Sequence, residues 1–344
     1  MASRIPVAVL GATGLVGQGI LALLAGHPRF RVAEAIASPR SAGKRYREAA
    51  TWRRRDQLDP EIAELRVQAG EDPVRSRVVF SSATSRVSTE LERRYAAESK
   101  LVISNASGHR MEAEVPLVVP EVNADHLELV RGRDGAIVTN CNCAAMFVAM
   151  VLAPLHREYG VQAVQVTTLQ AVSGGGYPGV PSLDILGNVV PLPGEEQKIE
   201  RELQKMLGTV AGNRIEPASF DVSAQSHRVP VIDGHTAAVS VRLGREVEPA
   251  EVVATLQAHR GIPQLQQLHS APDAPIVVTD LPDRPQPRLD AESHAGLVAT
   301  VGRVRRCSVL GIKMLVLGHN LVRGAAAAAV LNAETLDAMG LLPT

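Results

Sequence analysis

Two cysteines separated by a single residue are the side chains of this chain best suited to nucleophilic chemistry. Cys141 and Cys143 lie in the segment Thr139-Asn-Cys-Asn-Cys-Ala-Ala-Met-Phe, where an apolar strand is predicted to end and an apolar helix to begin. A thiol at a helix N-terminus becomes nucleophilic because the helix end stabilises its thiolate. Cys143 is the better placed of the two, in the first turn of that helix. Small buried cysteines are also common, and spacing alone leaves both interpretations open.

A glycine-rich turn near residue 10 predicts a dinucleotide-binding site. Gly11-Ala-Thr-Gly-Leu-Val-Gly17 follows the apolar run Ile5–Leu10 and opens a helical pattern over Leu15–Leu24. Glycines allow the tight turn and a close approach of the backbone to a phosphate, which the free N–H groups of the helix then bind. An ordinary strand-to-helix turn is the alternative. The residues expected to contact the cofactor are Gly11, Thr13, Gly14, Leu15, Val16 and Gly17.

The end of the second predicted strand, Arg31–Ala37, favours NADP over NAD. NAD sites carry an acidic residue here for the ribose hydroxyls, whereas the 2′-phosphate of NADP needs a cation. Glu34 lies inside the strand, too early for that role, and the strand is followed by Ser38, Arg40 and Ser41. These side chains can donate hydrogen bonds to a phosphate, and Arg40 adds positive charge. A solvated polar loop is the alternative.

The order of the predicted elements indicates an α/β fold with two domains. In the first part of the chain, short apolar runs alternate with helical patterns, which predicts a Rossmann-type parallel sheet with helices on both faces. Further on, the runs Val161–Leu169 and Thr236–Leu243 mix with helical spacing and predict a second, α+β domain. An alanine-rich helix over Asn320–Leu336 is expected to pack back on the first domain. The expected domains are residues 1–142, completed by a C-terminal helix at 320–344, and residues 143–319.

Composition is typical of a globular protein with a sizeable core. The 344 residues suggest about two domains, and 36 basic residues against 36 acidic ones leave no net charge. Balanced charge and 3% aromatic residues argue against a nucleic-acid partner. The three cysteines are too few for a disulfide framework, and they lack the spacing of a zinc site. Since no apolar run approaches the roughly twenty residues of a membrane span, we expect a cytoplasmic protein with no membrane partner and no metal ion.

Motifs along the whole chain resemble those of the aspartate-semialdehyde dehydrogenase family in its archaeal and fungal form. The matching segments, in family order, are Gly11–Gly17, Ala37–Lys44, Ser104–Met111, Val118–Asn123, Asn140–Cys143, Gln170–Asp184, Gly194–Lys198, Arg228–His235, Pro285–Asp290 and His319–Ala325. The resemblance implies a dinucleotide-binding domain, a catalytic and dimerisation domain, and a last helix that returns to the first domain. It also implies a homodimer or a homotetramer. The implied reaction is the NADPH-dependent reduction of L-aspartyl 4-phosphate to L-aspartate 4-semialdehyde with release of phosphate, in the biosynthesis of lysine, threonine and methionine.

The resemblance also implies catalytic and cofactor roles that spacing alone would not assign. The thiolate attacks the acyl carbonyl, phosphate leaves, and the resulting thioester accepts a hydride. An imidazole, whose ordinary pKa lies near neutrality, suits the accompanying proton transfers. The residues carried over are Cys143 as nucleophile, His235 as general acid and base, Gln170 as a residue that orients the intermediate, and Ser173, Gly174 and Asn320 in the cofactor site.

Charged residues and one amide are implied in substrate binding. Arg110 and Lys198 fall on phosphate-binding positions, with Asn142 beside them. Glu195 matches the residue that holds the substrate ammonium group, and Arg228 matches the one that binds the α-carboxylate. A dianionic leaving group needs cations, and a guanidinium fork suits a planar carboxylate. The i,i+3 spacing of Glu195 and Lys198 is equally typical of an exposed ion pair on a helix.

Departures from the family pattern bear on the substrate. Cys141 stands where many relatives have proline, Ser107-Gly108 where they often have Lys-Asn, and Ala144-Ala145 where the pair is more polar. With these changes, the substrate could also be a related acyl phosphate. It could equally be an acyl-CoA, as in the malonyl-CoA reductases, which share the thioester and hydride chemistry. A non-catalytic relative that binds only a cofactor or a partner protein is a third possibility, against which Cys143 and His235 argue.

Overall fold

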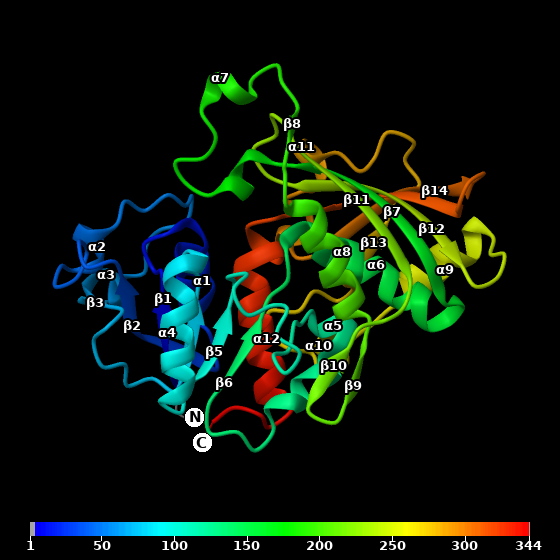
Figure 1. The fold of residues 1–344 in the computed structure, drawn as a ribbon. Coiled ribbons are helices and arrows are strands. Elements are labelled where there is room, and N and C mark those ends of the chain that lie inside the picture. Colours follow the sequence, from blue (N-terminus) through cyan, green and yellow to red (C-terminus); the bar gives the residue numbers. More distant parts are fainter. Residues whose placement is uncertain (1–3, 344) are drawn as a thin grey trace.

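Two β-sheets form the framework of the molecule (Figure 1), in a computed structural model that describes residues 4–343. The first sheet has the strand order β3-β2-β1-β4-β5-β6, and its neighbouring strands are parallel. Its strands are β1 (Ile5–Leu10), β2 (Phe30–Ala37), β3 (Val67–Ala69), β4 (Val78–Ser81), β5 (Leu101–Ser104) and β6 (Ala136–Thr139).

Helices cover both faces of the first sheet because its strands are apolar on both sides. Val7 of β1 packs in one core with helix α1 (Leu15–Leu24), whereas its neighbour Ala8 packs in another core with α4 (Ser85–Ala97). Alternate residues of a strand point to opposite faces. An uninterrupted apolar run therefore marks a strand that is buried on both sides. The predicted Rossmann-type fold class is confirmed.

The second sheet is mixed, with the order β13-β14-β15-β12-β7-β11-β8. Its strands are β7 (Val161–Gln170), β8 (Val190–Pro191), β11 (Asp221–Arg228), β12 (His235–Leu243), β13 (Ile276–Val278), β14 (Ala299–Cys307) and β15 (Gly311–Gly318). Helices α6 (Cys143–Tyr159), α8 (Glu195–Met206) and α9 (Pro249–Ala258) pack against these strands (Figure 1). Helix α6 gives this core an unbroken buried run from Ala144 to Leu155.

Several strands of the second sheet have little sequence signal of their own. In β11 the residues that face the core include Ala224 and Ser226, so the apolar alternation is weak. Strand β14 ends in a run rich in arginine, and β13 is short and lies in a proline-rich stretch.

The remaining elements are short helices, 3₁₀ segments and one hairpin. The helices are α2 (Tyr46–Ala49), α3 (Pro60–Glu64), α5 (Pro120–Asn123), α7 (Ser182–Ile185), α10 (Ile262–Leu265) and α11 (Pro287–Asp290). The 3₁₀ segments lie at Ala124–Val130, Val172–Gly175 and Ser293–Gly296, and the hairpin consists of β9 (Thr209–Ala211) and β10 (Arg214–Glu216).

The last helix lies in the middle of the molecule, beside the first sheet (Figure 1). A π-helical turn, Val322–Ala326, leads into α12 (Ala327–Ala338), whose Ala329 and Val330 pack in one core with α1. Compared with the predicted range Asn320–Leu336, α12 begins later, because Asn320 lies in a turn held by its own side chain and the π-helical turn follows it, and the helix ends slightly later, at Ala338. The domain boundaries at residues 142 and 319 stay a prediction, which this packing supports.

Candidate active site

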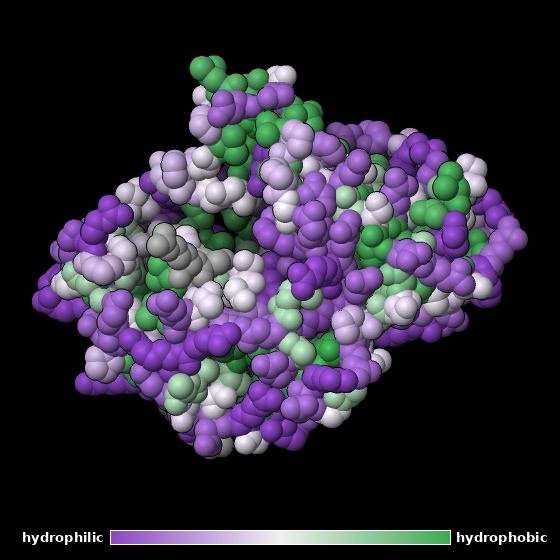
Figure 2. Space-filling view, viewed as in Figure 1, coloured by the Kyte–Doolittle hydropathy of each residue, from purple (hydrophilic) through white to green (hydrophobic). Residues whose placement is uncertain are grey.

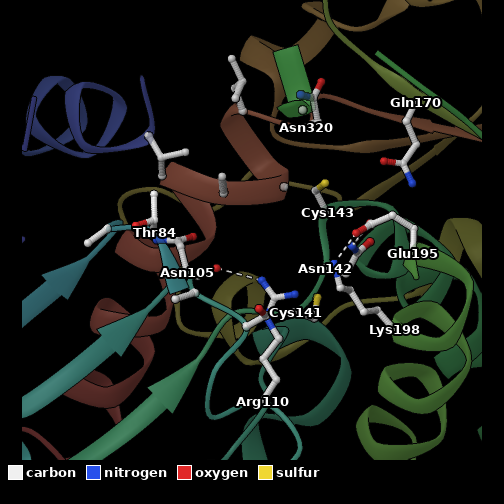
Figure 3. Close-up of a pocket in the computed structure, with 18 of the residues that line it drawn as sticks. Thr84, Asn105, Arg110, Cys141, Asn142, Cys143, Gln170, Glu195, Lys198 and Asn320 are labelled. Atoms are coloured by element: carbon white, nitrogen blue, oxygen red, sulfur yellow. Dashed lines mark hydrogen bonds and ion pairs between the residues drawn. The ribbon is translucent and has the colours of Figure 1, made fainter. Parts of the chain in front are cut away.

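The carboxyl edge of the first sheet faces one end of the second sheet, and a cavity of about 300 Å³ lies there (Figure 3). Ligands of open α/β sheets bind at this edge because the loops after the strands converge on it. The expected substrate-binding and catalytic residues that line the cavity are Arg110, Asn142, Cys143, Gln170, Glu195, Lys198 and Arg228. Two expected cofactor residues, Gly174 and Asn320, also line it.

Cys143 is the first residue of α6, and its thiol points into the cavity (Figure 3). The helix starts here because Asn142 caps it. The Asn142 Oδ1 accepts hydrogen bonds from the N–H groups of Ala144 and Ala145, at 2.9 and 3.2 Å. Asparagine is among the preferred residues at this position. Cys141, on the other side of Asn142, is only 2% exposed and belongs to the core under α6. Both cysteines border the cavity, but Cys143 is partly exposed at the start of α6, whereas Cys141 is almost fully buried.

The thiol of Cys143 is protonated at neutral pH in this structure. Burial raises its pKa to about 11, and the Glu195 carboxylate adds to the rise. Arg110 and Arg228 act in the opposite direction, because positive charge favours the thiolate. Burial also raises the pKa of Cys141. Position at the helix end therefore does not by itself make Cys143 a thiolate at neutral pH, since burial outweighs it.

Strand order brings Gln170, Arg228 and His235 together at one end of the second sheet. Strands β7 and β11 are parallel, and their last residues, Gln170 and Arg228, are paired. Strand β12 is antiparallel to β7 and begins with His235, beside the residue that ends β7. Because an antiparallel strand runs in the opposite direction, its first residue lies at the edge of the sheet where its neighbouring strands end. The three side chains, far apart in sequence, therefore meet at the same edge.

Gly174 leaves room for Arg228 to reach the cavity and for the ring of His235 to pack against the cavity wall, although His235 does not itself line the cavity. A Cβ atom at residue 174 would lie 2.9 Å from His235 Cε1 and 2.7 Å from Arg228 Nη1, so any larger residue would collide with both. The Ala171 N–H donates to His235 Nδ1 at 3.0 Å, and Arg228 Nη1 donates to the Ala171 carbonyl at 2.7 Å. A neutral imidazole that accepts at Nδ1 carries its proton on Nε2. That Nε2–H lacks a hydrogen-bond partner within residues 4–343.

The imidazole of His235 does not titrate near neutrality as expected from its residue type. Burial lowers its pKa to about 3, with further contributions from the charges of Arg228 and His319. The ring is therefore neutral at pH 7. A neutral ring with an unused Nε2–H is a hydrogen-bond donor, and this Nε2 lies against Gly174, a residue of the cavity wall.

Glu195 and Lys198 form the expected ion pair and line the cavity as well. Lys198 Nζ lies 2.5 Å from Glu195 Oε1, and the second carboxylate oxygen accepts from Asn142 Nδ2 at 2.7 Å. Burial acts to raise the pKa of Glu195, but the Lys198 and Asn142 contacts and the charge of Arg110 lower it below its ordinary value. Glu195 is thus an ionised carboxylate at the cavity wall, and the ion pair with Lys198 lies in that wall, while the substrate-binding roles of both residues stay a prediction.

Arg110, in the loop after β5, is held by a residue that sequence analysis did not single out. Its Nη1 donates to Glu202 Oε1 at 3.0 Å, and its Nη2 donates to the Asn105 carbonyl at 2.8 Å. Burial acts to lower the pKa of the guanidinium, and Glu202 reverses this effect, so the pKa is raised. The sequence spacing could have pointed to Glu202. It follows Glu195 by seven residues and Lys198 by four, so a helix places all of them on the same face, toward the site.

A second cavity runs from the glycine turn to the first. Its walls include the expected cofactor residues Thr13, Gly14, Leu15, Val16, Ser173 and Gly174. Val16, Gly174 and Leu321 line both cavities, so the two adjoin. A Cβ atom at Gly17 would lie 2.2 Å from the Gly11 carbonyl oxygen, and only glycine allows the helix to start so close to the strand. The channel therefore fits an extended dinucleotide whose pyrophosphate lies at the start of α1.

Asn320 lies in the wall of the first cavity, whereas the predicted residues Ser38, Arg40 and Ser41 line neither cavity. Asn320 Oδ1 accepts from the Gly234 N–H and its Nδ2 donates to Ser173 Oγ, both at 2.9 Å, so Asn320 connects the loops before His235 and after β7. In the segment after β2, the Ser41 N–H donates to the Ser38 carbonyl at 2.9 Å and closes a turn that exposes Arg40.

Neither a membrane span nor a metal cluster is found in the described chain. Over residues 4–343, helices fall short of the length and apolarity needed to cross a membrane. In the same range, groups of three or more His, Cys, Asp or Glu side chains that could hold a metal ion are absent. Cys141, Cys143 and Cys307 are all free thiols.

Fold and site together define a two-domain dehydrogenase of the semialdehyde dehydrogenase class, and known proteins agree. Residues 6–130 match the family model of the semialdehyde dehydrogenase NAD-binding domain, and residues 152–323 match that of its dimerisation domain. The aspartate-semialdehyde dehydrogenase of Methanothermobacter thermautotrophicus is 44% identical over 342 residues, covering 96% of this chain and 98% of that protein. The enzyme of Schizosaccharomyces pombe is 42% identical over 352 residues, covering 98% and 99%. The chain belongs to the aspartate-semialdehyde dehydrogenase family.

Solved structures agree with this assignment. The crystal structure of aspartate-semialdehyde dehydrogenase with NADP from Candida albicans matches with a TM-score of 0.93 at 39% identity, and the match covers 98% of this chain and 100% of that one. Aspartate-semialdehyde dehydrogenase II of Vibrio cholerae matches with a TM-score of 0.78 at 28% identity, covering 98% and 99%. The similarity to archaeal and fungal enzymes confirms the form of the family indicated by the motifs.

Proposed function

We propose that this chain catalyses the NADPH-dependent reduction of L-aspartyl 4-phosphate to L-aspartate 4-semialdehyde with release of phosphate. One observation carries the proposal: a thiol, cations for a phosphate and a carboxylate, and a carboxylate for an ammonium group line the same cavity. In this proposal the enzyme is cytoplasmic, and its product enters the biosynthesis of lysine, threonine and methionine.

The charges of the cavity support an amino-acid acyl phosphate as substrate. Arg110 and Lys198 would bind its phosphate, while Arg228 would bind its α-carboxylate. Glu195, ionised at the cavity wall, would hold its ammonium group. An acyl-CoA such as malonyl-CoA lacks that ammonium group and would make no use of the second oxygen atom of Glu195, which lies beyond the Lys198 ion pair. Glu195 therefore favours the aspartyl substrate over the acyl-CoA alternative, whereas Arg228 could bind the carboxylate of either.

In the proposed mechanism, the Cys143 thiol gives its proton to solvent, and the thiolate attacks the acyl carbonyl. Arg110 and Arg228 favour the thiolate, and Gln170 orients the acyl group. A carbon–sulfur bond forms, the carbon–oxygen bond to phosphate breaks, and a thioester remains. When bound, NADPH would supply the hydride that reduces this thioester. The neutral His235 donates a hydrogen bond from Nε2 to the carbonyl oxygen as negative charge develops there and keeps its proton, and collapse of the oxyanion releases the aldehyde and the thiolate.

The reaction is tested in the reverse direction by following NADP reduction with L-aspartate 4-semialdehyde. We expect the rate to depend on inorganic phosphate with saturation, because phosphate must attack the thioester to release the product. Turnover that is independent of phosphate, or no turnover, would contradict the proposal. NADPH oxidation with malonyl-CoA is the parallel assay for the acyl-CoA alternative, and we expect no reaction there.

NADP is the proposed cofactor, and Arg40 is its proposed 2′-phosphate contact. Glu34, the carboxylate within β2, accepts hydrogen bonds from the N–H groups of Arg75 and Ser76 and is not free for a ribose. Arg40→Ala is expected to lower kcat/KM for NADP about tenfold and to leave that for NAD unchanged, since one charged hydrogen bond is lost. Arg31→Ala, an exposed arginine near the other end of β2, is the control. An unchanged NADP-to-NAD preference would show that the assignment of Arg40 is wrong.

A homodimer formed through the second domain is also proposed. Apolar side chains gather on the projecting segment that carries α7 (Figure 2), where Leu183 is 91% exposed and Leu186 67%. Exposed apolar patches of this kind mark interaction surfaces, and the segment lies within the matched dimerisation domain. We expect the double variant Leu183→Glu, Leu186→Glu to dissociate the dimer in sedimentation experiments, whereas Leu265→Glu on α10 does not. A parent protein that sediments as a monomer would refute this proposal.

A further inference from the structure

One face of helix α8 carries charged residues beyond the two that line the cavity. Glu195, Lys198, Glu202 and Lys205 follow one another at spacings of three, four and three residues, which aligns them along one side of the helix. The first two reach the cavity. Glu202 and Lys205 lie farther along the helix and are only 1% and 2% exposed. Buried charges are costly unless they are paired, so their partners indicate what they do.

Glu202 joins the two segments that bound the expected phosphate end of the cavity. One carboxylate oxygen accepts from Arg110 Nη1 at 3.0 Å, and the other accepts from the backbone N–H of Asn142. Asn142 directly precedes Cys143, while Arg110 reaches the same place from the loop after β5 (Figure 3). A single carboxylate thus fixes the position of the guanidinium relative to the backbone of the nucleophile.

Lys205 holds the backbone that carries Arg110. Its Nζ donates to the carbonyl groups of Arg110, Glu112 and Val115 at 2.6, 2.6 and 2.8 Å. An ammonium group has three hydrogens and no acceptor, so these carbonyls use its full capacity. The loop after β5 is therefore anchored to α8 through the main chain by Lys205 and through a side chain by Glu202.

We propose that Glu202 and Lys205 are positioning residues, which set the place of the Arg110 guanidinium beside Cys143 and thereby the affinity for the phosphate group. The inference rests on the proposed function, in which Arg110 binds phosphate. A guanidinium held in advance loses little freedom when it binds its ligand. Glu202 and Lys205 touch neither the cavity nor the expected substrate, so they act through Arg110.

The test is a double-mutant cycle on the full-length enzyme in the phosphate-dependent reverse reaction. Glu202→Gln is combined with Arg110→Ala, and KM for phosphate, KM for the semialdehyde and kcat are measured for all four proteins. Glu200→Gln is the matched control, because Glu200 lies on the same helix but accepts from the Ala224 N–H at 3.0 Å, away from Arg110. Thermal unfolding reports folding, and if Glu202→Gln does not fold, Glu202→Asp and Lys205→Arg replace it in the cycle.

We expect Glu202→Gln to raise KM for phosphate about tenfold, with KM for the semialdehyde changed less than about twofold. The effect should disappear in the Arg110→Ala background, since Glu202 then has no guanidinium to position. A rise of equal size in both backgrounds, or a loss of kcat and stability without a change in KM for phosphate, would overturn the inference. Should Arg110→Ala itself leave KM for phosphate unchanged, the phosphate role assigned to Arg110 under the proposed function fails, and the inference fails with it.

Discussion

Replacing Cys143 by serine is expected to lower kcat/KM by at least about a thousandfold while the protein stays folded. Serine fits the same space at the start of α6, but its hydroxyl is a much weaker nucleophile near neutral pH. Reverse-direction NADP reduction measures the loss, and thermal unfolding checks the fold. Cys307→Ser, at the end of β14 and away from the cavity-lining residues, is the control and should retain the parental rate.

The environment of Cys143 also predicts how its reactivity depends on pH. Because burial raises the pKa of the thiol to about 11, little thiolate is present at pH 7. The rate of alkylation by iodoacetamide should rise about tenfold for each pH unit between pH 7 and 10. Mass spectrometry should find the label on Cys143 and not on the buried Cys141. Parental turnover by Cys143→Ser, or first labelling of Cys141, would contradict the assignment of the nucleophile.

Replacing His235 by asparagine is expected to lower kcat about a hundredfold or more, with small changes in KM. Asparagine retains an acceptor for the Ala171 N–H but removes the Nε2–H, which lies against Gly174 of the cavity wall. Steady-state kinetics in the reverse direction make the measurement. His294→Asn, at an exposed position in a 3₁₀ segment, is the control. A kcat within a few-fold of the parent would exclude a catalytic role for His235.

The low pKa of His235 has a consequence for stability. Below its ordinary value of 6.5 the unfolded chain takes up a proton on this side chain, whereas the folded chain does so only near pH 3. Folding stability should therefore decline as pH falls through this window, by up to about 1.4 kcal/mol per pH unit from this group. His235→Asn should show a shallower decline in urea unfolding between pH 7 and 5. Equal slopes in the parent and the variant would be evidence against a neutral buried ring.

Local patterns in the sequence determined the elements that begin the site. The strand at Ile5–Leu10 and the helix at Leu15–Leu24 have the predicted bounds, because an apolar run and a glycine turn act within a few residues. The position of Cys143 at a helix start is local in the same way, since Asn142 supplies the cap. The roles implied for the residues around it came from motif resemblance along the chain, which carries information that periodicity lacks.

Only the tertiary structure decided which of these residues meet and in what protonation state. Gln170, Arg228 and His235 share one edge because β7, β11 and β12 are neighbours, and β11 has almost no apolar signal of its own. The pKa values of Cys143 and His235 lie far from their ordinary ones because the packed protein around each group removes most of its contact with water. Burial is a property of the packed chain, since it depends on every element that covers a residue. For the same reason no local pattern could pair Glu202 with Arg110, whose contact joins two segments that are 92 residues apart.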